Sequence, residues 1–170
     1  FGSGGVGTSL HLAGELLKGA AGIDIVHVPY RGAAPALAAL MGGSEIQMLF
    51  DSTATSIAHI RSGRIKGLAI ASRARTPALP DLPTFSESGM PGFEVGVAHG
   101  VLVPAATGAA VIATLNRAIN TALEDAAYRK QMASLAVDIV GGTPEQFRLF
   151  LAAERNRWRE VIQKQGIKID

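Results

Sequence analysis

The sequence contains no cysteine among its 170 residues. Disulfide bonds, thiolate nucleophiles and cysteine-ligated zinc or iron–sulfur sites are therefore excluded. Charged residues make up only 18% of the chain, their formal net charge is +2, and no run of lysine and arginine is present. We therefore expect no nucleic acid as a partner. Glycine, proline or a charged residue interrupts every apolar run well before the ~18 residues that a membrane-spanning helix needs.

What the sequence has in quantity is apolar residues, at 48%, and glycine, of which there are 20. The length corresponds to about one domain, which is large enough to bury a sizeable core. The chain begins at Phe1 with neither an initiator methionine nor a basic-then-apolar leader. We expect that an upstream segment was processed away or left out.

The first part of the chain alternates strand-like and helical patterns. We expect strands at residues 23–28, 46–50 and 65–71, and helices at residues 8–18, at residues 36–41 and after residues 51–53. Strand, turn and helix in alternation, with short loops, are typical of an α/β fold with a mainly parallel sheet flanked by helices. Such sheets bind ligands beyond the carboxyl ends of their strands, which here points to residues 30–34 and 51–53.

A stretch rich in proline and glycine at residues 75–92 interrupts this rhythm, and the composition shifts near residue 93. The elements expected after it are a strand-like segment at residues 93–103, a helix capped by Thr107, a shorter helix to about residue 135, a short strand at residues 137–140 and a long helix that begins at residues 143–146. The start of the long helix, Thr-Pro-Glu-Gln, combines an N-cap threonine, a proline suited to the first turn and a glutamine placed for a capping box.

Residues 2–7 read Gly-Ser-Gly-Gly-Val-Gly and match the G-x-G-x-x-G pattern. Such a loop lets a helix N-terminus approach an anion. With the hydroxyls of Thr8 and Ser9, successive backbone N–H groups form a nest that would accept a carboxylate without a charged side chain. Two alternatives stay open: a dinucleotide site with Arg31 facing a 2′-phosphate, although no strand precedes the loop, and a mobile chain terminus.

The other polar candidates predict neither a metal site nor catalysis. The four histidines lie at no metal-like spacing, and motifs such as G-x-S-x-G, H-E-x-x-H and the P-loop are absent from the sequence. His11, one turn into the first helix, has either a binding or a packing role, and the other histidines are expected to be core or surface residues. Asp51 precedes Ser52 and is expected to cap the next helix or to accept a ligand's ammonium group or water, capping being the favoured interpretation.

Three segments together carry a family resemblance. They are residues 5–15 (GVGTSLHLAGE), residues 28–37 (VPYRGAAPAL) and the stretch formed by residues 79–84 (LPDLPT) and 87–94 (ESGMPGFE). Jointly they resemble the Bug family of solute-binding receptors, which are extracytoplasmic receptors of tripartite tricarboxylate transporters. The resemblance runs over essentially the whole chain.

The resemblance implies a two-lobed periplasmic binding protein of the type II kind that closes on a small carboxylate or acidic amino acid without catalysis and without a cofactor. It also implies membrane transporter subunits as partners. The ligand contacts that it implies are Gly7, Thr8, Ser9, Gly32, Ala33, Ala34 and Asp51, with His11 and Tyr30 behind them. The runner-up function is an NADP-linked α/β enzyme that uses the 2–7 loop.

One departure from the family concerns the first lobe. Nothing in the chain matches the family's N-terminal strand–loop–helix unit with its Pro-Pro-Gly-Gly-type loop. Residues 1–92 are therefore expected to form the second ligand-binding lobe, and residues 93–170 the crossover strand and C-terminal helical part of an incomplete first lobe. A C-terminal fragment of this kind exposes apolar helix faces and is expected to self-associate.

Overall fold

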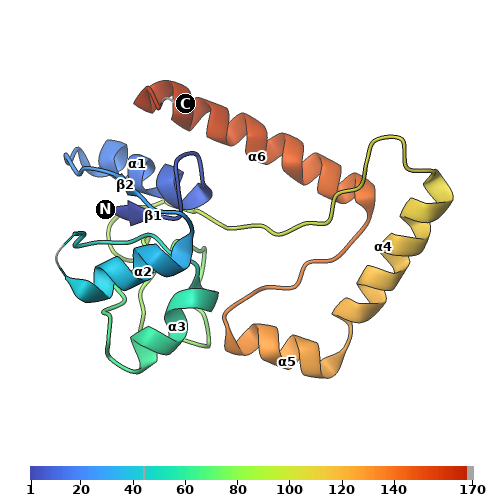
Figure 1. The fold of residues 1–170 in the computed structure, drawn as a ribbon, viewed down its shortest axis with the longest axis horizontal. Helices are drawn as coiled ribbons and strands as arrows, with labels where there is room; N and C mark the ends of the chain where they lie inside the picture. The colour runs from blue at the N-terminus through green and yellow to red at the C-terminus, as the bar shows by residue number, and fades with distance from the viewer. Residues whose placement is uncertain (44, 168–170) are drawn as a thin grey trace.

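The computed structural model describes residues 1–43 and 45–167 and has an α/β fold with a small parallel sheet (Figure 1). The sequence predicts a second part at residues 93–170, and its last three residues lie outside the described ranges. The elements, in chain order, are β1 (Gly2–Ser3), α1 (Ser9–Ala21), β2 (Val28–Pro29), α2 (Ala33–Gly42), α3 (Thr53–Arg61), α4 (Ala109–Leu123), α5 (Ala126–Ser134) and α6 (Pro144–Gln165).

The strand pairings are parallel, as the alternation of elements predicts. Gly2 lies opposite Val28 in the β1–β2 pair and also forms a parallel bridge with Leu49. A further parallel bridge joins Ile70 to Thr84. The predicted strands at residues 23–28, 46–50 and 65–71 are therefore much shorter than expected, because each has regular pairing at only one or two positions.

β1 lies where the sequence predicts a loop, and it is the central strand of this sheet. The Gly2 N–H donates to the Met48 carbonyl at 2.8 Å, and the Val28 N–H donates to the Phe1 carbonyl at 2.8 Å. A side chain at position 2 would meet the side chains of Ile46, Leu49 and Tyr30. Gly2 is therefore a position at which two neighbouring segments approach the backbone closely.

Every residue that the structure describes as buried lies between Phe1 and Phe93. The buried apolar residues are Phe1, Leu12, Ala13, Ala36, Leu37, Ile46, Ile57, Leu79 and Phe93. The ring of Phe93 stacks on Phe85 at a centroid distance of 4.2 Å, and Phe50 stacks on Phe85 at 6.2 Å. The helices α1, α2 and α3 surround the sheet in this compact part (Figure 1).

Beyond Phe93, no residue whose exposure the structure describes is buried. α4 and α5 lie away from the sheet, and α6 runs back to contact α1 (Figure 1). Arg157 on α6 donates a hydrogen bond to the Glu94 carbonyl, which ties this helix to the segment that leaves the core. Whether the two parts are two lobes of a receptor, and whether the chain self-associates, stay predictions.

The caps of the late helices agree with the sequence only in part. The predicted capping box of α6 is confirmed, with Thr143 accepting from the Gln146 N–H and the Gln146 side chain accepting from the Thr143 N–H. For α4 the predicted cap is wrong: the N-cap is Gly108, and the Thr107 N–H instead closes a turn with the Pro104 carbonyl.

The late strands are not formed. Residues 93–103 and 137–140 form no strand within the described ranges, and beyond the buried Phe93 many of their side chains are open to solvent, with Leu102 76% and Val140 91% exposed. The reason is the lack of a neighbouring strand in that part of the structure, since β structure needs a partner. In the described part of the chain, no helix has the length and apolarity required to cross a membrane.

Candidate ligand-binding site

Three helices begin at the same edge of the sheet. β1 is paired with β2 on one side and with Leu49 on the other, all in parallel. The segments that follow lead into α1, α2 and α3, whose N-caps are Thr8, Gly32 and Ser52. The carboxyl ends of parallel strands meet at one edge, so the structure brings the three predicted site segments together there.

The 4–8 loop is folded by its own hydrogen bonds. The Thr8 hydroxyl donates to the Gly5 carbonyl at 2.8 Å and accepts from the His11 N–H at 3.3 Å, which makes it the N-cap of α1. The Gly7 N–H donates to Nδ1 of His11 at 3.1 Å. Thr8 and Gly7 thus use their donors to shape the loop. Within residues 1–43 and 45–167, no hydrogen-bond partner is found for the half-buried Ser9 hydroxyl.

The loop before α2 lies directly against the 4–8 loop. The Gly32 N–H donates to the Gly4 carbonyl at 3.1 Å, and a methyl group on Gly4 would lie 3.4 to 3.6 Å from backbone atoms of Gly32 and Ala33. Gly32 has φ 109° and ψ 173°, a conformation essentially restricted to glycine. No side chain caps α2, so the N–H groups of Ala33 and Ala34 begin the helix uncapped.

Tyr30, predicted to lie behind the ligand contacts, points toward the far end of α2. Its hydroxyl donates to the Glu45 carboxylate at 2.8 Å, and this bond raises the pKa of the Tyr30 phenol. Its ring lies over Gly2 of β1. The side chain therefore packs along the sheet, and its N–H extends the pairing by donating to the Ser3 carbonyl at 3.1 Å.

Asp51 does not cap α3, so the favoured interpretation of this residue is wrong. The cap is Ser52, whose hydroxyl accepts from the Ala54 N–H at 3.3 Å. Asp51 instead accepts hydrogen bonds from the hydroxyls of Thr55, at 2.6 Å, and Ser56 through Oδ2. Its second oxygen, Oδ1, is buried and has no hydrogen-bond partner among the described residues.

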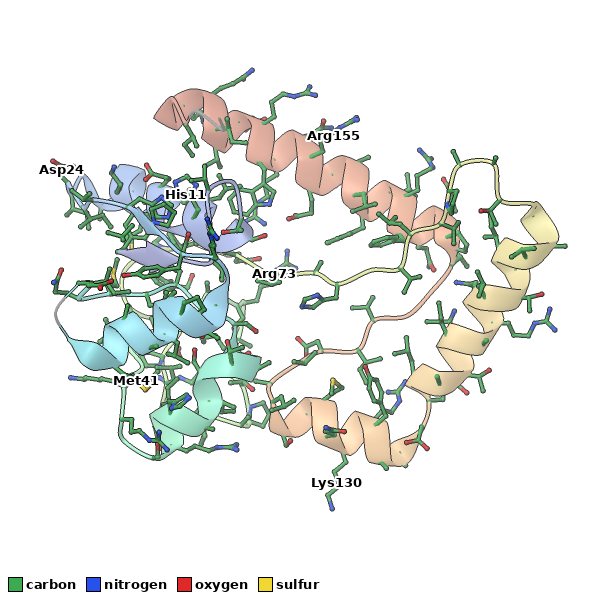
Figure 2. The ribbon with its side chains drawn as sticks, viewed as in Figure 1. His11, Asp24, Met41, Arg73, Lys130 and Arg155 are labelled. Atoms are coloured by element: carbon green, nitrogen blue, oxygen red, sulfur yellow. The ribbon has the colours of Figure 1, made fainter. Side chains whose placement is uncertain are left out.

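Two histidines lie stacked behind the 4–8 loop. The rings of His11 and His27 are 3.9 Å apart between centroids with an interplanar angle of 18°, and His11 is only 6% exposed. Nε2 of His27 is 2.7 Å from Oγ of the fully buried Ser3, and the same oxygen accepts from the Gly5 N–H at 3.1 Å. Figure 2 shows the His11 side chain inside the compact part of the molecule, whereas Lys130 and Arg155 point away from it.

Burial shapes the ionisation of this pair. It lowers the pKa of His27 to about 4, with the neighbouring His11 as the next cause. Burial also lowers the pKa of His11, and Glu15, whose Oε1 lies 3.8 Å from Nε2 of His11, partly offsets this lowering.

The Ser3–His27 contact was not predicted from the sequence. No sequence signal indicates it, because it depends on the parallel pairing of β1 with β2, which places Ser3 beside the residues next to His27.

The structure does not reproduce the dinucleotide fingerprint. Gly2 lies inside β1 and Ser3 is fully buried, so the glycine motif begins within a strand instead of following it. Arg31, the expected contact for a 2′-phosphate, is exposed. In residues 1–43 and 45–167, no group of three histidine or acidic side chains is placed to hold a metal ion.

Two depressions lie away from this edge. One of about 280 Å³ is lined by Leu16 and Ala20 of α1 and by residues 89–93. The other, of about 370 Å³, lies between residues 76–77 and the end of α5 with the segment after it. Neither depression is lined by a predicted site residue.

Comparison with known proteins decides the family. The profile of the tripartite tricarboxylate transporter family receptor, TctC, matches residues 1–167. The chain belongs to this family. The prediction made from the three sequence segments is thereby confirmed, and the similarity extends to proteins named Bug.

Curated relatives differ in how much of their length the chain matches. The UPF0065 protein from the tcbD–tcbE intergenic region of Pseudomonas sp. strain P51 is 37% identical over 163 residues, which cover 95% of this chain and 48% of that protein. BugT of Bordetella pertussis is 35% identical over 96% of this chain and 50% of its own length. The UPF0065 protein from the clcB–clcD region of Pseudomonas knackmussii is 36% identical over 93% of this chain and 94% of its own length.

Solved structures share the fold. The periplasmic binding protein BugD superposes with a TM-score of 0.89 and 32% identity, over 98% of this chain and 56% of BugD. A Rhodopseudomonas palustris protein with adipate gives 0.86 and 30% identity over 98% and 56% of the two chains. MatC of the same organism, with bound malate, gives 0.79 and 30% identity over 95% and 56%. The chain therefore spans about half the length of these structures and of two of the curated relatives.

Proposed function

We propose that the chain is part of an extracytoplasmic solute-binding receptor that captures a small dicarboxylate and catalyses no reaction. The observation that carries the proposal is the meeting of three helix N-termini at one edge of the sheet, in a chain of the TctC family. Relatives with adipate and with malate support a dicarboxylate as the ligand class.

Helix N-termini favour carboxylates for an electrostatic reason. Each carries roughly half a positive charge from its aligned peptide dipoles and has N–H groups without intrahelical partners. The loops before α1 and α2 touch at Gly4 and Gly32, so two such ends lie close together. A dicarboxylate suits this arrangement, because each of its charged groups can face one helix end.

The predicted residues then divide into two roles. Ser9 donates its hydroxyl to one carboxylate, and Ala33 and Ala34 donate their backbone N–H groups to the other. Gly7, Thr8 and Gly32 hold the loops in shape through the internal bonds described above. Oδ1 of Asp51 accepts a hydrogen bond from a ligand hydroxyl or ammonium group, or from an ordered water.

The proposal also covers where the receptor acts and which proteins it binds. Relatives named as periplasmic binding proteins support a periplasmic receptor, and the family description supports transporter subunits in the membrane as its partners. Self-association through the exposed apolar side chains of residues 94–167 is part of this proposal as well.

The test is a calorimetric titration of the chain with malate, adipate, the uncharged adipamide and NADP. We expect saturable binding of at least one dicarboxylate and none of adipamide or NADP. Ser9→Ala should weaken that binding about 10- to 100-fold, the range for losing a hydrogen bond to a charged group. The exposed Ser86→Ala is the matched control and should bind like the parent. Heat from NADP alone would overturn the proposal, as would equal affinity in both serine variants.

A further inference from the structure

The stack of the buried His11 on the half-buried His27 is hydrogen-bonded to the candidate binding loop. His11 bonds the Gly7 N–H at 3.1 Å, and His27 bonds Ser3, whose hydroxyl oxygen receives the Gly5 N–H at 3.1 Å. The two rings therefore hold the 4–8 loop at both of its ends. The N-cap of α1 follows immediately, so the position of this loop sets the direction of the first N–H groups of that helix.

The bond from Gly7 requires a neutral His11. Nδ1 accepts the Gly7 N–H, so it carries no proton, and the ring hydrogen of the neutral form is on Nε2, toward the Glu15 carboxylate at 3.8 Å. A proton taken up by His11 must go to Nδ1, because Nε2 already has one. Nδ1 then becomes a donor facing another donor, and the bond to Gly7 is lost.

The charges around the stack disfavour this proton at neutral pH. The two rings face each other at 3.9 Å, so a charge on one opposes a charge on the other. The amino group of Phe1 and Lys18 add positive charge near the pair, and Glu15 is the acidic group that faces it. Burial is the larger cause and lowers the pKa of both rings.

We propose that the neutral His11–His27 stack positions the 4–8 loop for carboxylate binding, and that protonation of the stack releases the loop and lowers ligand affinity in acid. This inference rests on the proposed function and adds two positioning residues, with a pH dependence, to the same site. Neither ring contacts the ligand: His11 acts through the Gly7 amide and His27 through Ser3.

The test compares pH profiles of malate and adipate affinity between pH 7.5 and 4.5. His11→Asn places an amide oxygen near the former Nδ1 and cannot titrate, whereas His11→Leu removes the acceptor. We expect His11→Leu to weaken binding at least about tenfold at pH 7.5, the cost of one lost hydrogen bond that orients the site. His11→Asn should recover most of the affinity at pH 7.5 and keep only the acid dependence that protonation of the ligand itself causes.

His27→Gln keeps an amide at the position of Nε2 and serves as the second variant. The exposed His99→Asn is the matched control and should keep the full pH profile of the parent. Parallel pH profiles for the parent and His11→Asn would overturn the inference. An affinity that rises in acid in the parent alone would overturn it too, because attraction between the imidazolium and the ligand would then outweigh release of the loop.

A ligand-free readout separates this inference from the proposed function. In the parent chain, the amide ¹H and ¹⁵N shifts of Gly7 should follow the titration of the His11 ring, and in His11→Asn they should not. If no dicarboxylate binds while Gly7 follows His11, the proposed function fails and the positioning of the loop stands. If Gly7 is indifferent to the protonation of His11, the inference fails whatever the ligand does.

Discussion

Three glycines at the two ends of α2 allow backbone strain to be measured without steric clash. Gly32 at the N-cap has φ 109°, Gly43 at the C-cap has φ 72°, and Gly42 is the last residue of the helix. Apart from its chain neighbours and the backbone of the helix itself, a methyl group added at any of the three would meet no atom of the described residues within 4 Å. Replacing each by alanine therefore changes the backbone energy and little else.

The expected changes in the free energy of unfolding differ in sign and size. Gly32→Ala should destabilise by about 1–3 kcal/mol, because its conformation is one that only glycine adopts readily. Gly43→Ala should cost about 1–2 kcal/mol, the penalty of a left-handed conformation for a residue with a Cβ. Gly42→Ala should be neutral or stabilise by up to about 1 kcal/mol, since alanine is the better helix former.

Urea denaturation followed by far-ultraviolet circular dichroism measures these three values. A calorimetric titration with malate or adipate provides the second readout, in which Gly32→Ala alone should weaken binding, because only Gly32 lies at the candidate site. If Gly32→Ala were as stable as the parent to within about 0.5 kcal/mol, the size of a neutral surface substitution, the argument that this turn is held in a strained conformation would be refuted.

Three further predictions concern single side chains. Folding lowers the pKa of His27 from 6.5 to about 4, so the unfolded chain binds more protons below pH 6.5. The contribution of His27 to the free energy of unfolding is therefore fully present above pH 6.5 and is lost as the pH falls to about 4. The loss is at most about 3 kcal/mol, and the partial exposure of the ring makes it smaller. Urea denaturation at pH 7 and at pH 4.5 should find a smaller loss of stability in His27→Gln than in the parent. Asp51→Asn weakens the bonds from Thr55 and Ser56 and should cost about 1.5–3 kcal/mol in the same assay at pH 7. Thr143→Ala removes a capping box and should lower the free energy of local opening in the first turn of α6 by about 1 kcal/mol. Amide hydrogen exchange in that turn should become faster, while the urea midpoint of global unfolding stays unchanged.

Features that depend on neighbouring residues could be predicted from the sequence. The sequence predicts an N-cap of α1 at Thr8 or Ser9, which the structure has at Thr8. The capping box of α6 at Thr143 and its left-handed C-cap at Gly166 likewise involve residues within one or two turns. The common edge of the site segments could also be predicted, because the carboxyl ends of parallel strands meet on one side.

Features that depend on contacts between distant residues could not. The pairing that makes a strand of Gly2 and Ser3 joins them to residues more than twenty positions away. The same pairing brings His27 beside Ser3, so that the Ser3 hydroxyl and the His27 ring are hydrogen-bonded to each other, although nothing in the sequence indicates this contact. The Thr8 hydroxyl shows the same limit on a smaller scale, because a residue chosen as a ligand contact uses its proton on the Gly5 carbonyl.

The segments at residues 93–103 and 137–140 separate strand propensity from strand formation. Both are rich in valine, leucine and isoleucine, as strands are. In the described part of the chain neither forms a strand: the Val95 N–H donates to the Ala71 carbonyl at 2.9 Å, and residues farther along such as Val101 are 67% exposed. Past the buried Phe93, burial within this chain therefore does not hold these segments in place. The prediction of strands in these segments is therefore wrong for this structure, because their sequence pattern indicates a local preference, whereas strand formation also needs a neighbouring strand.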